Sequence, residues 1–448
     1  MAGHPGGEKG VSGNVILGAG VAGLGAAHGL RQRGEASVVY EARARAGGLL
    51  DSITIQSERG PFRFDSAVHL SFASEPEVRA VFDRTPYLTH KPESFCYDAG
   101  YWLKHPVQNN LFALPAEQKV ELIAGLAAAP EGEIATYRDW LLQQYGAPIA
   151  ERWPLRYTEK YWTVPAERLG TAWVGQRMRR ADIREVLQGA FEPETPNQYY
   201  VKEMRYPAKG GYRAFIEPLI EDAEIVYGAE AVAIDPRGRT VRFADGRSTG
   251  YDRLISTAPL PRLAEMMGAP DAVLADAETL FASTVDLISI GFGKPSASPA
   301  LWFYIYDEDI LAARGYSPDL KSRNNVPDGC SSIQFEIYGS RERPTTSDVE
   351  ALKRDTVAGV LKMGLATREE ILFAEHHHLP YGNVVFDLGM EERRDRVRAW
   401  VESQGVQTAG RFGEWDYLWS NQSMMSGMRA AEAALSPPPA SPARAASR

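Results

Sequence analysis

Three glycines near the N-terminus have the spacing of a tight turn between a strand and a helix. Gly18, Gly20 and Gly23 form a G-x-G-x-x-G pattern, preceded by the apolar run NVIL and followed by a helix-like stretch. In such a turn the first glycine permits the bend, the second lets the backbone approach a pyrophosphate, and the third lets the helix pack on the strand. A helix N-terminus also favours negative charge. The pattern predicts dinucleotide binding, with a turn that only packs helix on strand as the alternative.

A carboxylate stands where a dinucleotide-binding turn requires one. Glu41 ends a second apolar run, SVVYE, about twenty residues after the glycines, where its side chain can accept both ribose hydroxyls. The strand, the turn, the helix and the acid together predict a βαβ unit at the start of the chain.

The length, net charge and cysteine content of the chain exclude several classes of protein. The chain has 448 residues, a formal net charge of −9 and dispersed Lys and Arg residues, so we expect no nucleic-acid partner. Its two cysteines, Cys96 and Cys330, form no C-x-x-C pair and predict neither a disulfide framework nor a thiolate metal site. This favours a reducing, cytoplasmic setting. Without an apolar leader or a bilayer-length apolar run, we expect no membrane association.

The rest of the chain alternates between helical and strand-like patterns. Residues from about Leu111 to Gly189 have helical spacing, and those from about Ala223 to Ser256 are strand-rich. Further strands are predicted at TVDLISIGFG and SSIQFEIYG, a helix at VEALKRDTVAGVLKMG, and a glycine turn with a helix from GRFGEWDYLWSNQ onward. The tail SPPPASPARAASR is predicted to be disordered.

Several segments resemble, in the same order, the motifs of one enzyme family. HPVQNNLFALP is similar to the YP-x-QNN-x-x-x-LP stretch of the eukaryotic-type UDP-galactopyranose mutases. YEARARAGGLL resembles the FAD superfamily that contains these mutases, the amine oxidases and protoporphyrinogen oxidase. The resemblance continues through RYTEKYWTVPAERLGTAWVGQRM, RYPAKGG, LWFYIYDED, LPYGNVVFD and GRFGEWDYLWSNQ, and it covers residues 14 to 435.

The resemblance implies an α/β fold, in which a helical domain and an antiparallel-sheet domain are inserted into an FAD-binding Rossmann-like domain. We expect the FAD-binding parts at residues 14–85, 209–260 and 391–435. The helical substrate and nucleotide domain is expected at 86–208, the antiparallel-sheet substrate domain at 261–390, and the disordered tail at 436–448.

The family's reaction interconverts the pyranose and furanose forms of a nucleotide-linked sugar without net oxidation. The resemblance implies that N5 of reduced FAD attacks the anomeric carbon and displaces the nucleoside diphosphate, with NADPH or NADH as the reductant. The cofactor then supplies the hard chemistry, and the protein supplies position and charge. The implied protein is a flavin-dependent isomerase whose partner is a nucleotide sugar.

The resemblance assigns the substrate contacts. Arg177 and Arg314 match arginines that contact the diphosphate, although the spacing around Arg314 differs from the family's. Gln108 matches a glutamine that holds uridine, but His105 and Val107 replace the aromatic residues beside it, so a stacking face for uracil is partly lost. Salt bridges and core packing are the alternative interpretations for these residue types. The other expected substrate contacts are Tyr157, Trp162, Trp302, Tyr304, Tyr381 and Tyr417.

The resemblance also assigns the flavin contacts. His69 stands where the family has the histidine of a GGH loop, and its hydrogen bonds are expected to respond to flavin protonation. Ala67 and Val68 replace the paired glycines, which should stiffen the loop. The expected cofactor-binding residues are Gly18, Gly20, Gly23, Glu41, Arg43, Gly48, Arg411, Asn421 and Gln422.

The run His376, His377 and His378 invites a metal-binding interpretation. Adjacent strand residues point to opposite faces, and no carboxylate at a suitable spacing completes a site. We therefore predict no metal.

Two other functions remain open. The first is an FAD-dependent oxidase of the amine oxidase superfamily acting on a small molecule, and the second is a sugar-nucleotide binding relative without turnover. The expected phosphate-directed arginines and tyrosines argue against the oxidase, because a neutral amine or porphyrin has no need of them.

Overall fold

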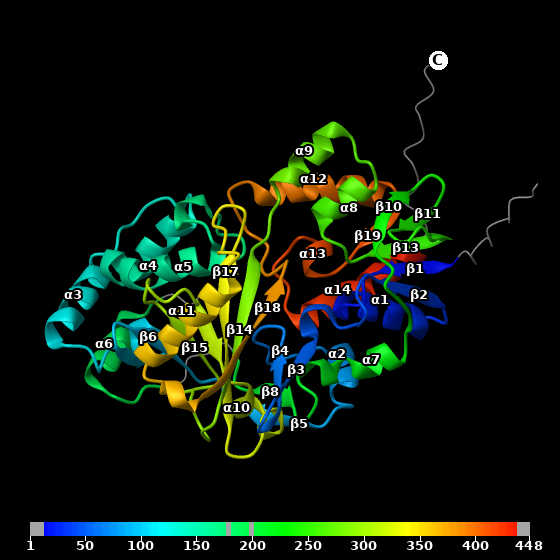
Figure 1. Ribbon diagram of the computed structural model, residues 1–448. Coiled ribbons are helices and arrows are strands. Elements are labelled where there is room, and N and C mark those ends of the chain that lie inside the picture. Colours follow the sequence, from blue (N-terminus) through cyan, green and yellow to red (C-terminus); the bar gives the residue numbers. More distant parts are fainter. Residues whose placement is uncertain (1–12, 176–180, 197–200, 437–448) are drawn as a thin grey trace, which may run out of the picture.

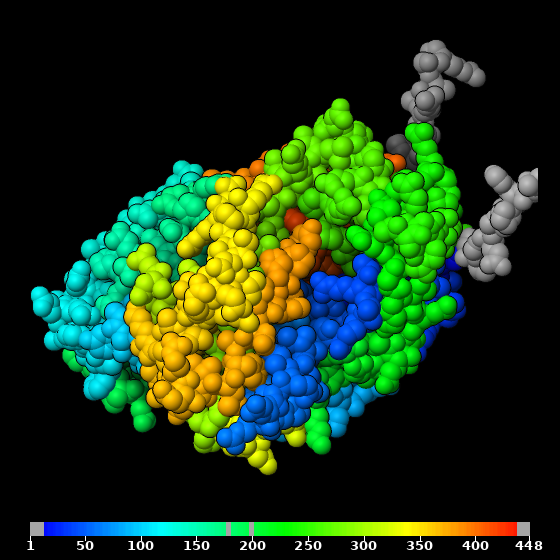
Figure 2. Space-filling view, viewed as in Figure 1, coloured from blue at the N-terminus to red at the C-terminus, as the bar shows by residue number. Residues whose placement is uncertain are grey.

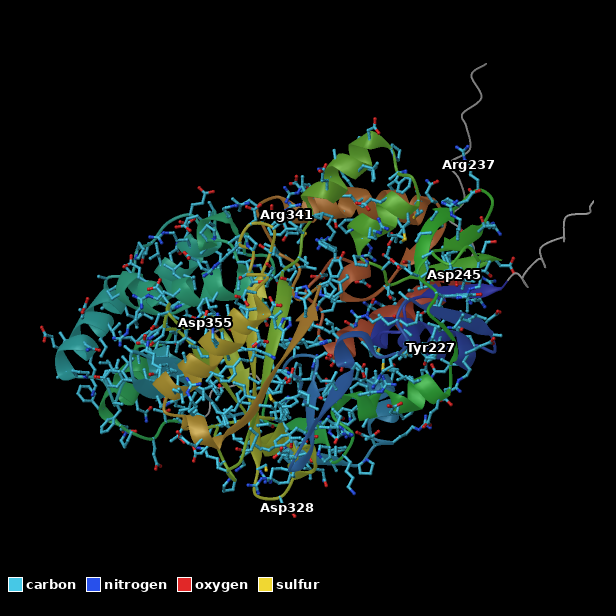
Figure 3. All side chains as sticks on the ribbon, in the orientation of Figure 1. Tyr227, Arg237, Asp245, Asp328, Arg341 and Asp355 are labelled. Atoms are coloured by element: carbon cyan, nitrogen blue, oxygen red, sulfur yellow. The ribbon has the colours of Figure 1, made fainter. Side chains whose placement is uncertain are left out.

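The computed structural model describes residues 13–175, 181–196 and 201–436. A parallel sheet lies toward one end of the molecule, a larger sheet occupies the middle, and a group of helices lies at the other end (Figure 1). The predicted α/β class with a Rossmann-like βαβ unit is confirmed. Charged side chains of both signs point outward over the surface, as Arg237, Asp245, Asp328, Arg341 and Asp355 illustrate in Figure 3.

The smaller sheet is parallel throughout and has the strand order β19-β13-β1-β2-β9. Strand β1 lies at its centre and is fully buried, as expected for an apolar run covered on both faces. The predicted strand, turn and helix are β1, residues 18–20 and α1. The elements of this region are β1 (Asn14–Leu17), α1 (Val21–Gln32), β2 (Ser37–Glu41), β9 (Glu224–Tyr227), β13 (Arg253–Ser256) and β19 (Val406–Thr408).

Helix α14 (Ser420–Leu435) packs on α1 along a line of glycines, a contact called the glycine seam below. A Cβ added at Gly427 would lie 1.9 Å from the carbonyl oxygen of Ala22, and one at Gly25 would lie 2.5 Å from that of Met424. Only glycine allows backbones to approach so closely. The seam therefore joins two segments that lie almost 400 residues apart, as the adjoining blue and red helices of Figure 1 show.

The larger sheet has seven strands in the order β18-β14-β17-β16-β15-β6-β7. Helix α11 (Val349–Lys362) covers one face, where Leu352 and Val360 pack with Ile288 and Phe335. The opposite face lines the cavities described below. The strands are β6 (Ser94–Asp98), β7 (Tyr101–Lys104), β14 (Thr284–Phe292), β15 (Trp302–Ile305), β16 (Arg314–Tyr316), β17 (Ser331–Gly339) and β18 (Ile371–Leu379).

Two details of this sheet differ from the expectation. Strands β6 and β7 come from the segment 86–208 that was expected to be helical, and β6 pairs with β15 in parallel, so the sheet is mixed rather than antiparallel. The two strands form a hairpin around Ala99 and Gly100, which both have positive φ, of 49° and 88°. A two-residue turn with positive φ at both positions matches the twist of a hairpin.

The helical end of the molecule consists of α3 to α6. The start of α4 is fixed by a capping box, in which the Thr136 side chain accepts from the Asp139 N–H and the Asp139 carboxylate accepts from the Thr136 N–H. The helices are α3 (Ala116–Ala127), α4 (Tyr137–Arg152), α5 (Pro154–Trp162) and α6 (Ile183–Phe191).

Small units connect the two sheets. Strands β10 to β12 form a separate antiparallel sheet, β3 pairs with β4, and β5 pairs with β8. Helices α8, α9 and α12 pack together beside the sheet of β10 to β12 (Figure 1). These elements are β3 (Ser52–Ser57), β4 (Gly60–Asp65), α2 (Pro76–Phe82), β5 (Tyr87–His90), β8 (Met204–Pro207), α7 (Glu217–Glu221), β10 (Ala231–Asp235), β11 (Thr240–Phe243), β12 (Ser248–Gly250), α8 (Leu260–Met266), α9 (Asp271–Thr279), α10 (Pro318–Lys321), α12 (Met390–Ser403) and α13 (Gly410–Gly413).

Candidate active site

A cavity of about 600 Å³ opens in front of the glycine turn. A Cβ added at Gly20 would meet only the Cα of Gly48, at 3.9 Å, so the space before Gly20 belongs to the cavity. Gly23 differs, since its Cβ would lie 1.8 Å from the carbonyl oxygen of Gly18. The second glycine of the motif thus leaves room for a ligand, and the third brings the helix against the strand. We call this space the dinucleotide cavity.

Glu41 fixes the edge of the dinucleotide cavity. Its Oε2 accepts a hydrogen bond from the Ala19 N–H at 2.7 Å, and its Oε1 accepts one from the Arg43 N–H at 2.9 Å. Glu41 and Arg43 both line the cavity. Gly48 lines it too and has a φ of 56°, in the left-handed region that favours glycine. Glycines at the turn and an anchored carboxylate at the end of β2 are the features that a bound dinucleotide needs.

A second cavity of about 1010 Å³ adjoins the first, and we call it the aromatic cavity. Leu49, His69, Leu379, Arg411 and Ser420 line both, so the two spaces share a wall. The aromatic cavity also contains most of the substrate contacts expected from the sequence. Those that line it are Gln108, Tyr157, Trp162, Trp302, Tyr304, Arg314 and Tyr417.

Arg314 occupies the middle of a polar row that crosses three strands. The strand register places Tyr304 of β15 opposite Arg314 of β16, and Arg314 opposite Glu336 of β17. The Arg314 Nε donates to the Glu336 carboxylate, and its Nη2 donates to the Tyr338 hydroxyl at 3.1 Å. Among the described residues, nothing accepts a hydrogen bond from its Nη1. One edge of the guanidinium is therefore anchored, and the rest is left for a ligand.

The charge of Arg314 is secure although the group is buried. Burial disfavours the charged form, but the Glu336 carboxylate outweighs it and holds the pKa of Arg314 well above its ordinary value. Burial likewise opposes ionisation of Glu336, while Arg314 and the Tyr338 hydroxyl hold the pKa of Glu336 below its usual range. The pair stays ionised, and the Arg314 guanidinium presents its positive charge to the aromatic cavity, which Arg411 also lines.

Tyrosine hydroxyls surround Arg314. The Tyr161 and Tyr417 hydroxyls lie 2.7 Å apart, and the Trp302 indole N–H donates to the Tyr304 hydroxyl at 3.1 Å. Burial raises the pKa of Tyr157 and of Tyr304. These phenols therefore remain protonated at neutral pH and can donate hydrogen bonds to an anion.

His69 lies at the junction of the two cavities. Its Nδ1 is 3.0 Å from the carbonyl oxygen of Ala67, and its ring stacks on Tyr212 with centroids 4.9 Å apart. Burial lowers the pKa of His69 to about 4, so the ring is neutral at pH 7. Ala67 has a φ of 91°, a conformation that costs a non-glycine residue energy. Ala67 thus adopts a backbone conformation that favours glycine.

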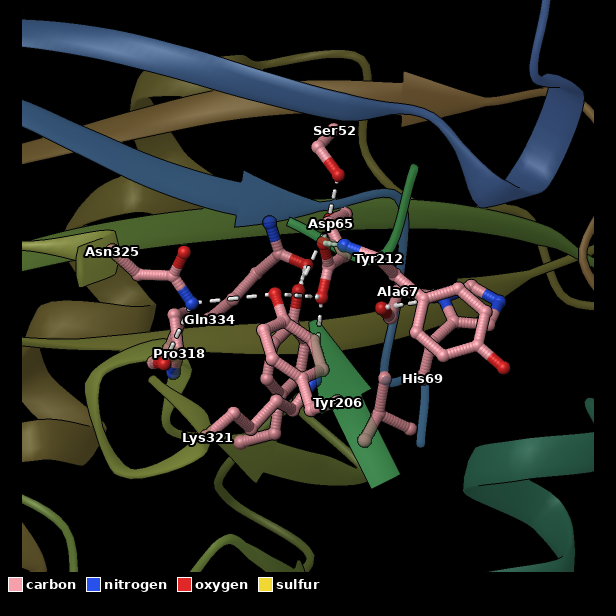
Figure 4. Close-up of polar contacts among 12 residues, drawn as sticks. Ser52, Asp65, Ala67, His69, Tyr206, Tyr212, Pro318, Lys321, Asn325 and Gln334 are labelled. Carbon is pink, nitrogen blue, oxygen red and sulfur yellow. Dashed lines mark hydrogen bonds and ion pairs between the residues drawn. The ribbon is translucent and has the colours of Figure 1, made fainter. Parts of the chain in front are cut away.

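A buried network around Asp65 holds this loop in place (Figure 4). The Asp65 carboxylate accepts from the Ser52 hydroxyl, the Tyr212 backbone N–H and the Tyr206 hydroxyl, at 2.9, 2.8 and 2.9 Å. The Lys321 ammonium lies 3.4 Å from the same carboxylate. Burial lowers the pKa of Lys321 to about 8. Asp65 is the last residue of β4, and the loop that carries His69 follows it. The network therefore fixes the start of that loop.

Arg411 also lies at the junction. Its Nε and Nη2 donate to the carbonyl oxygen of Leu418 at 2.9 and 2.7 Å, and its Nη1 donates to that of Gly382 at 3.2 Å. The guanidinium thus ties two wall segments together. Tyr381, expected at the substrate, instead lines the dinucleotide cavity.

Asn421 and Gln422, expected at the cofactor, line neither cavity. The Asn421 amide donates to Glu75 at 2.8 Å, and the Gln422 side chain accepts from the Trp419 N–H at 2.9 Å, at the start of α14. Both side chains serve the local structure. Ser420, one residue earlier, lines both cavities instead.

The ribbon at residues 105–110 forms one end of the aromatic cavity. His105 is half-buried, its ring lies 4.7 Å from that of Tyr304, and desolvation lowers the pKa of His105 to about 4. Gln108 and Val107 line the same end. An imidazole and a valine therefore stand where the resemblance places aromatic residues, as the sequence indicates.

Some site residues escaped the sequence analysis, and one lies outside the described residues. Arg177 falls in the gap at 176–180. Glu336, Tyr161 and Tyr338 contact Arg314, yet none was predicted. A glutamate inside the apolar strand SSIQFEIYG was an available signal, because a buried carboxylate requires a partner.

The histidine run differs from the expectation. His376 and His378 lie on one face of β18, and both contact Asp286 of the neighbouring strand β14. The sequence analysis found no carboxylate to complete a group, because Asp286 lies 90 residues from His376 along the chain and is brought close only by strand pairing.

No helix of the described residues is both long and apolar enough to cross a lipid bilayer.

Comparison with known proteins agrees with the geometry. Residues 16–85 match the NAD(P)-binding Rossmann-like domain family. A structure of reduced UDP-galactopyranose mutase superimposes with a TM-score of 0.87 and 25% sequence identity, covering 94% of this chain and 95% of that one. A protein of Exiguobacterium sp. 255-15 assigned as a protoporphyrinogen oxidase gives a TM-score of 0.71 at 18% identity, covering 95% and 99%. A putrescine oxidase variant gives 0.63 at 14% identity, covering 94% and 98%. The chain thus has the fold of the flavin enzymes that include UDP-galactopyranose mutase, and the resemblance drawn from its motifs is confirmed.

Proposed function

We propose that the protein is a flavin-dependent mutase that interconverts the pyranose and furanose forms of a nucleotide-linked sugar. The observation that carries this proposal is Arg314, whose anchored guanidinium faces an aromatic cavity that shares a wall with the dinucleotide cavity. A fixed positive charge among tyrosine hydroxyls suits a diphosphate. A neutral amine or porphyrin has no use for it.

FAD is the cofactor that we assign to the dinucleotide cavity. Gly20 and Gly48 leave space for a pyrophosphate, and Glu41 stands where it can accept ribose hydroxyls. The flavin ring would then reach the shared wall formed in part by His69 and Arg411. When bound and reduced, with NADPH or NADH as the electron source, FAD would supply a nucleophilic nitrogen for reaction at the anomeric carbon.

The chain's own residues position the sugar nucleotide and stabilise charge. Arg314 and the hydroxyls of Tyr304 and Tyr417 would bind the diphosphate and stabilise the charge that develops as it leaves. Tyr157, Trp162 and Trp302 add apolar contact. Arg177 is proposed as a second phosphate contact because of its place in the GQRM motif.

His69 and the ribbon complete the assignment. A neutral imidazole at the shared wall can donate or accept a hydrogen bond at the flavin without adding charge. Gln108 is proposed to contact the nucleoside at the far end of the aromatic cavity, with His105 and Val107 shaping the space for its base.

One experiment separates this function from an FAD-dependent oxidase. The purified protein is reduced with dithionite or NADPH under nitrogen and offered UDP-, dTDP- and GDP-linked sugars, and the products are separated by chromatography. We expect a furanose isomer from one nucleotide series. In a parallel assay in air-saturated buffer, we expect no oxygen to be consumed in proportion to the product. Isomerisation by the oxidised enzyme, or peroxide formed in proportion to an amine or alcohol substrate, would contradict the proposal.

A further inference from the structure

Three potential metal ligands meet on two paired strands, away from the cavities. Strand β18 forms the edge of the larger sheet and pairs with β14 so that His378 lies opposite Asp286 and His376 lies opposite Ile288. Side chains two residues apart on a strand share a face. His376, His378 and Asp286 therefore point to the same side, and we call them the His-Asp-His cluster.

The cluster lies on the face of the sheet that α11 covers. On β14, Ile288 and Ile290 pack in the apolar layer beneath α11, and Asp286 continues the same row. His377 points to the other face, where the charges of Arg43 and Asp51 are its neighbours. Figure 2 shows the orange segment of β18 reaching the surface between α11 and the blue N-terminal hairpin. The cluster is thus separated from the proposed flavin site by the thickness of the sheet.

The ligand atoms converge. The Nε2 of His376 and the Nδ1 of His378 each lie 2.8 Å from the Oδ1 of Asp286, and the three atoms lie within 4.8 Å of one another. Among the described residues, no other group of three His, Cys, Asp or Glu side chains brings its ligand atoms so close together. A metal bound at about 2.0 to 2.2 Å from each atom needs only small rotations of the two rings.

The surroundings of the cluster favour binding. The Thr345 hydroxyl donates to the Oδ2 of Asp286 at 2.7 Å, which turns Oδ1 toward the imidazoles. Such support of a carboxylate ligand is typical of metal sites. The Asp286 side chain is 5% exposed and that of His378 is 47% exposed. The Asp286 side of the cluster is thus held rigidly, and the His378 side is open for the entry of an ion and for a water ligand.

From this geometry we propose that Asp286, His376 and His378 bind a divalent transition-metal ion of the Zn²⁺ type. Two imidazole nitrogens and one carboxylate oxygen select such ions over Mg²⁺ and Ca²⁺, which prefer oxygen ligands. The ion joins the edge strand β18 to β14 and to the segment before α11. Leu379, the last residue of β18, lines both cavities, so the ion also steadies their shared wall.

Zinc titration of matched variants tests this proposal. Untagged, EDTA-treated protein is titrated with ZnCl₂ by calorimetry, and thermal unfolding is followed with and without zinc. We expect one ion per chain, a higher Tm with zinc, and affinity that is weaker by roughly tenfold or more in His378→Gln and Asp286→Asn. His377→Gln is the control, because it removes an imidazole from the same run but from the other face, and it should bind zinc like the wild type.

The outcomes are distinct. Equal zinc affinity in His377→Gln and His378→Gln would overturn the proposal, and so would a wild type that binds no zinc at micromolar concentration. Circular dichroism without metal verifies that each variant is folded. Mutase activity does not enter the readout, so the result is independent of the proposed function.

Discussion

At the level of single residues, Gly20 and Gly23 belong to the same motif but differ in what surrounds them. A side chain at position 20 would extend into the dinucleotide cavity, whereas one at position 23 would collide with the Gly18 carbonyl. We expect Gly20→Val to fold with an unchanged Tm in the absence of FAD and to bind FAD at least about tenfold more weakly, which corresponds to about 1.4 kcal/mol. Flavin absorbance per chain after reconstitution measures the loss.

Gly23→Ala is the matched control for that experiment. Overpacking against the backbone should lower the free energy of unfolding by about 1 to 3 kcal/mol, as measured in urea, whether or not the cofactor is present. A Gly20→Val protein that retains its full flavin content would contradict the assignment of the cavity.

Arg314 offers a second test at this scale. Removing its charge would leave Glu336 buried without a partner, so Arg314→Lys is the informative change. Lysine keeps the positive charge, but it lacks the planar set of N–H donors with which arginine can bond to Glu336 and to a ligand at the same time. We expect the Kd for the sugar nucleotide to rise by roughly tenfold or more, with flavin content unchanged. Arg156→Lys on the surface of α5 is the control, and equal affinity in the two variants would remove Arg314 from the binding site.

At the level of elements, the glycine seam makes α14 part of the dinucleotide-binding unit. We expect Gly427→Ala to lower the free energy of unfolding by about 2 kcal/mol or more, because the added Cβ forces α14 away from the Ala22 carbonyl. Arg429→Ala, on the exposed side of the same helix, should change it by no more than about 0.5 kcal/mol. Urea unfolding measures both, and a neutral Gly427→Ala would mean that the helices can separate without cost.

The secondary-structure elements also show which features the sequence predicts and which it does not. Strands β1, β14 and β17 and helix α11 were predicted because each has a local apolar pattern. The row of Tyr304, Arg314 and Glu336 was not predicted as a unit, since it depends on a register among three strands that no local pattern specifies. Asn421 and Gln422 were placed at the cofactor because their segment resembles a flavin motif, but hydrogen bonds to Glu75 and to the α14 N-terminus hold them elsewhere.

At the level of the whole molecule, two half-buried histidines link stability to pH. Burial lowers the pKa values of His69 and His105 from 6.5 to about 4. Between pH 6.5 and 4 the unfolded chain therefore binds protons that the folded chain does not, and the free energy of unfolding falls as the pH falls. Each residue contributes up to about 3 kcal/mol, which is fully present above pH 6.5 and lost by about pH 4.

Replacing one histidine measures this contribution. Between pH 4 and 6.5, His105→Gln should reduce the slope of the free energy of unfolding against pH by roughly the contribution of one histidine. Urea unfolding of the variant and of the wild type at the same series of pH values provides the comparison. A slope identical to that of the wild type would show that His105 is protonated in the folded protein.

The strand order of the parallel sheet governs how the protein forms during synthesis. Strand β1 is synthesised more than 230 residues before its partner β13, and α1 is synthesised almost 400 residues before α14. Until β13 is made, one edge of β1 stays unpaired, and until α14 is made, α1 lacks the helix that its glycines fit. This region therefore completes its folding only after α14 has left the ribosome, and chaperones that shield exposed strand edges should engage the nascent chain between the synthesis of β1 and that of β13.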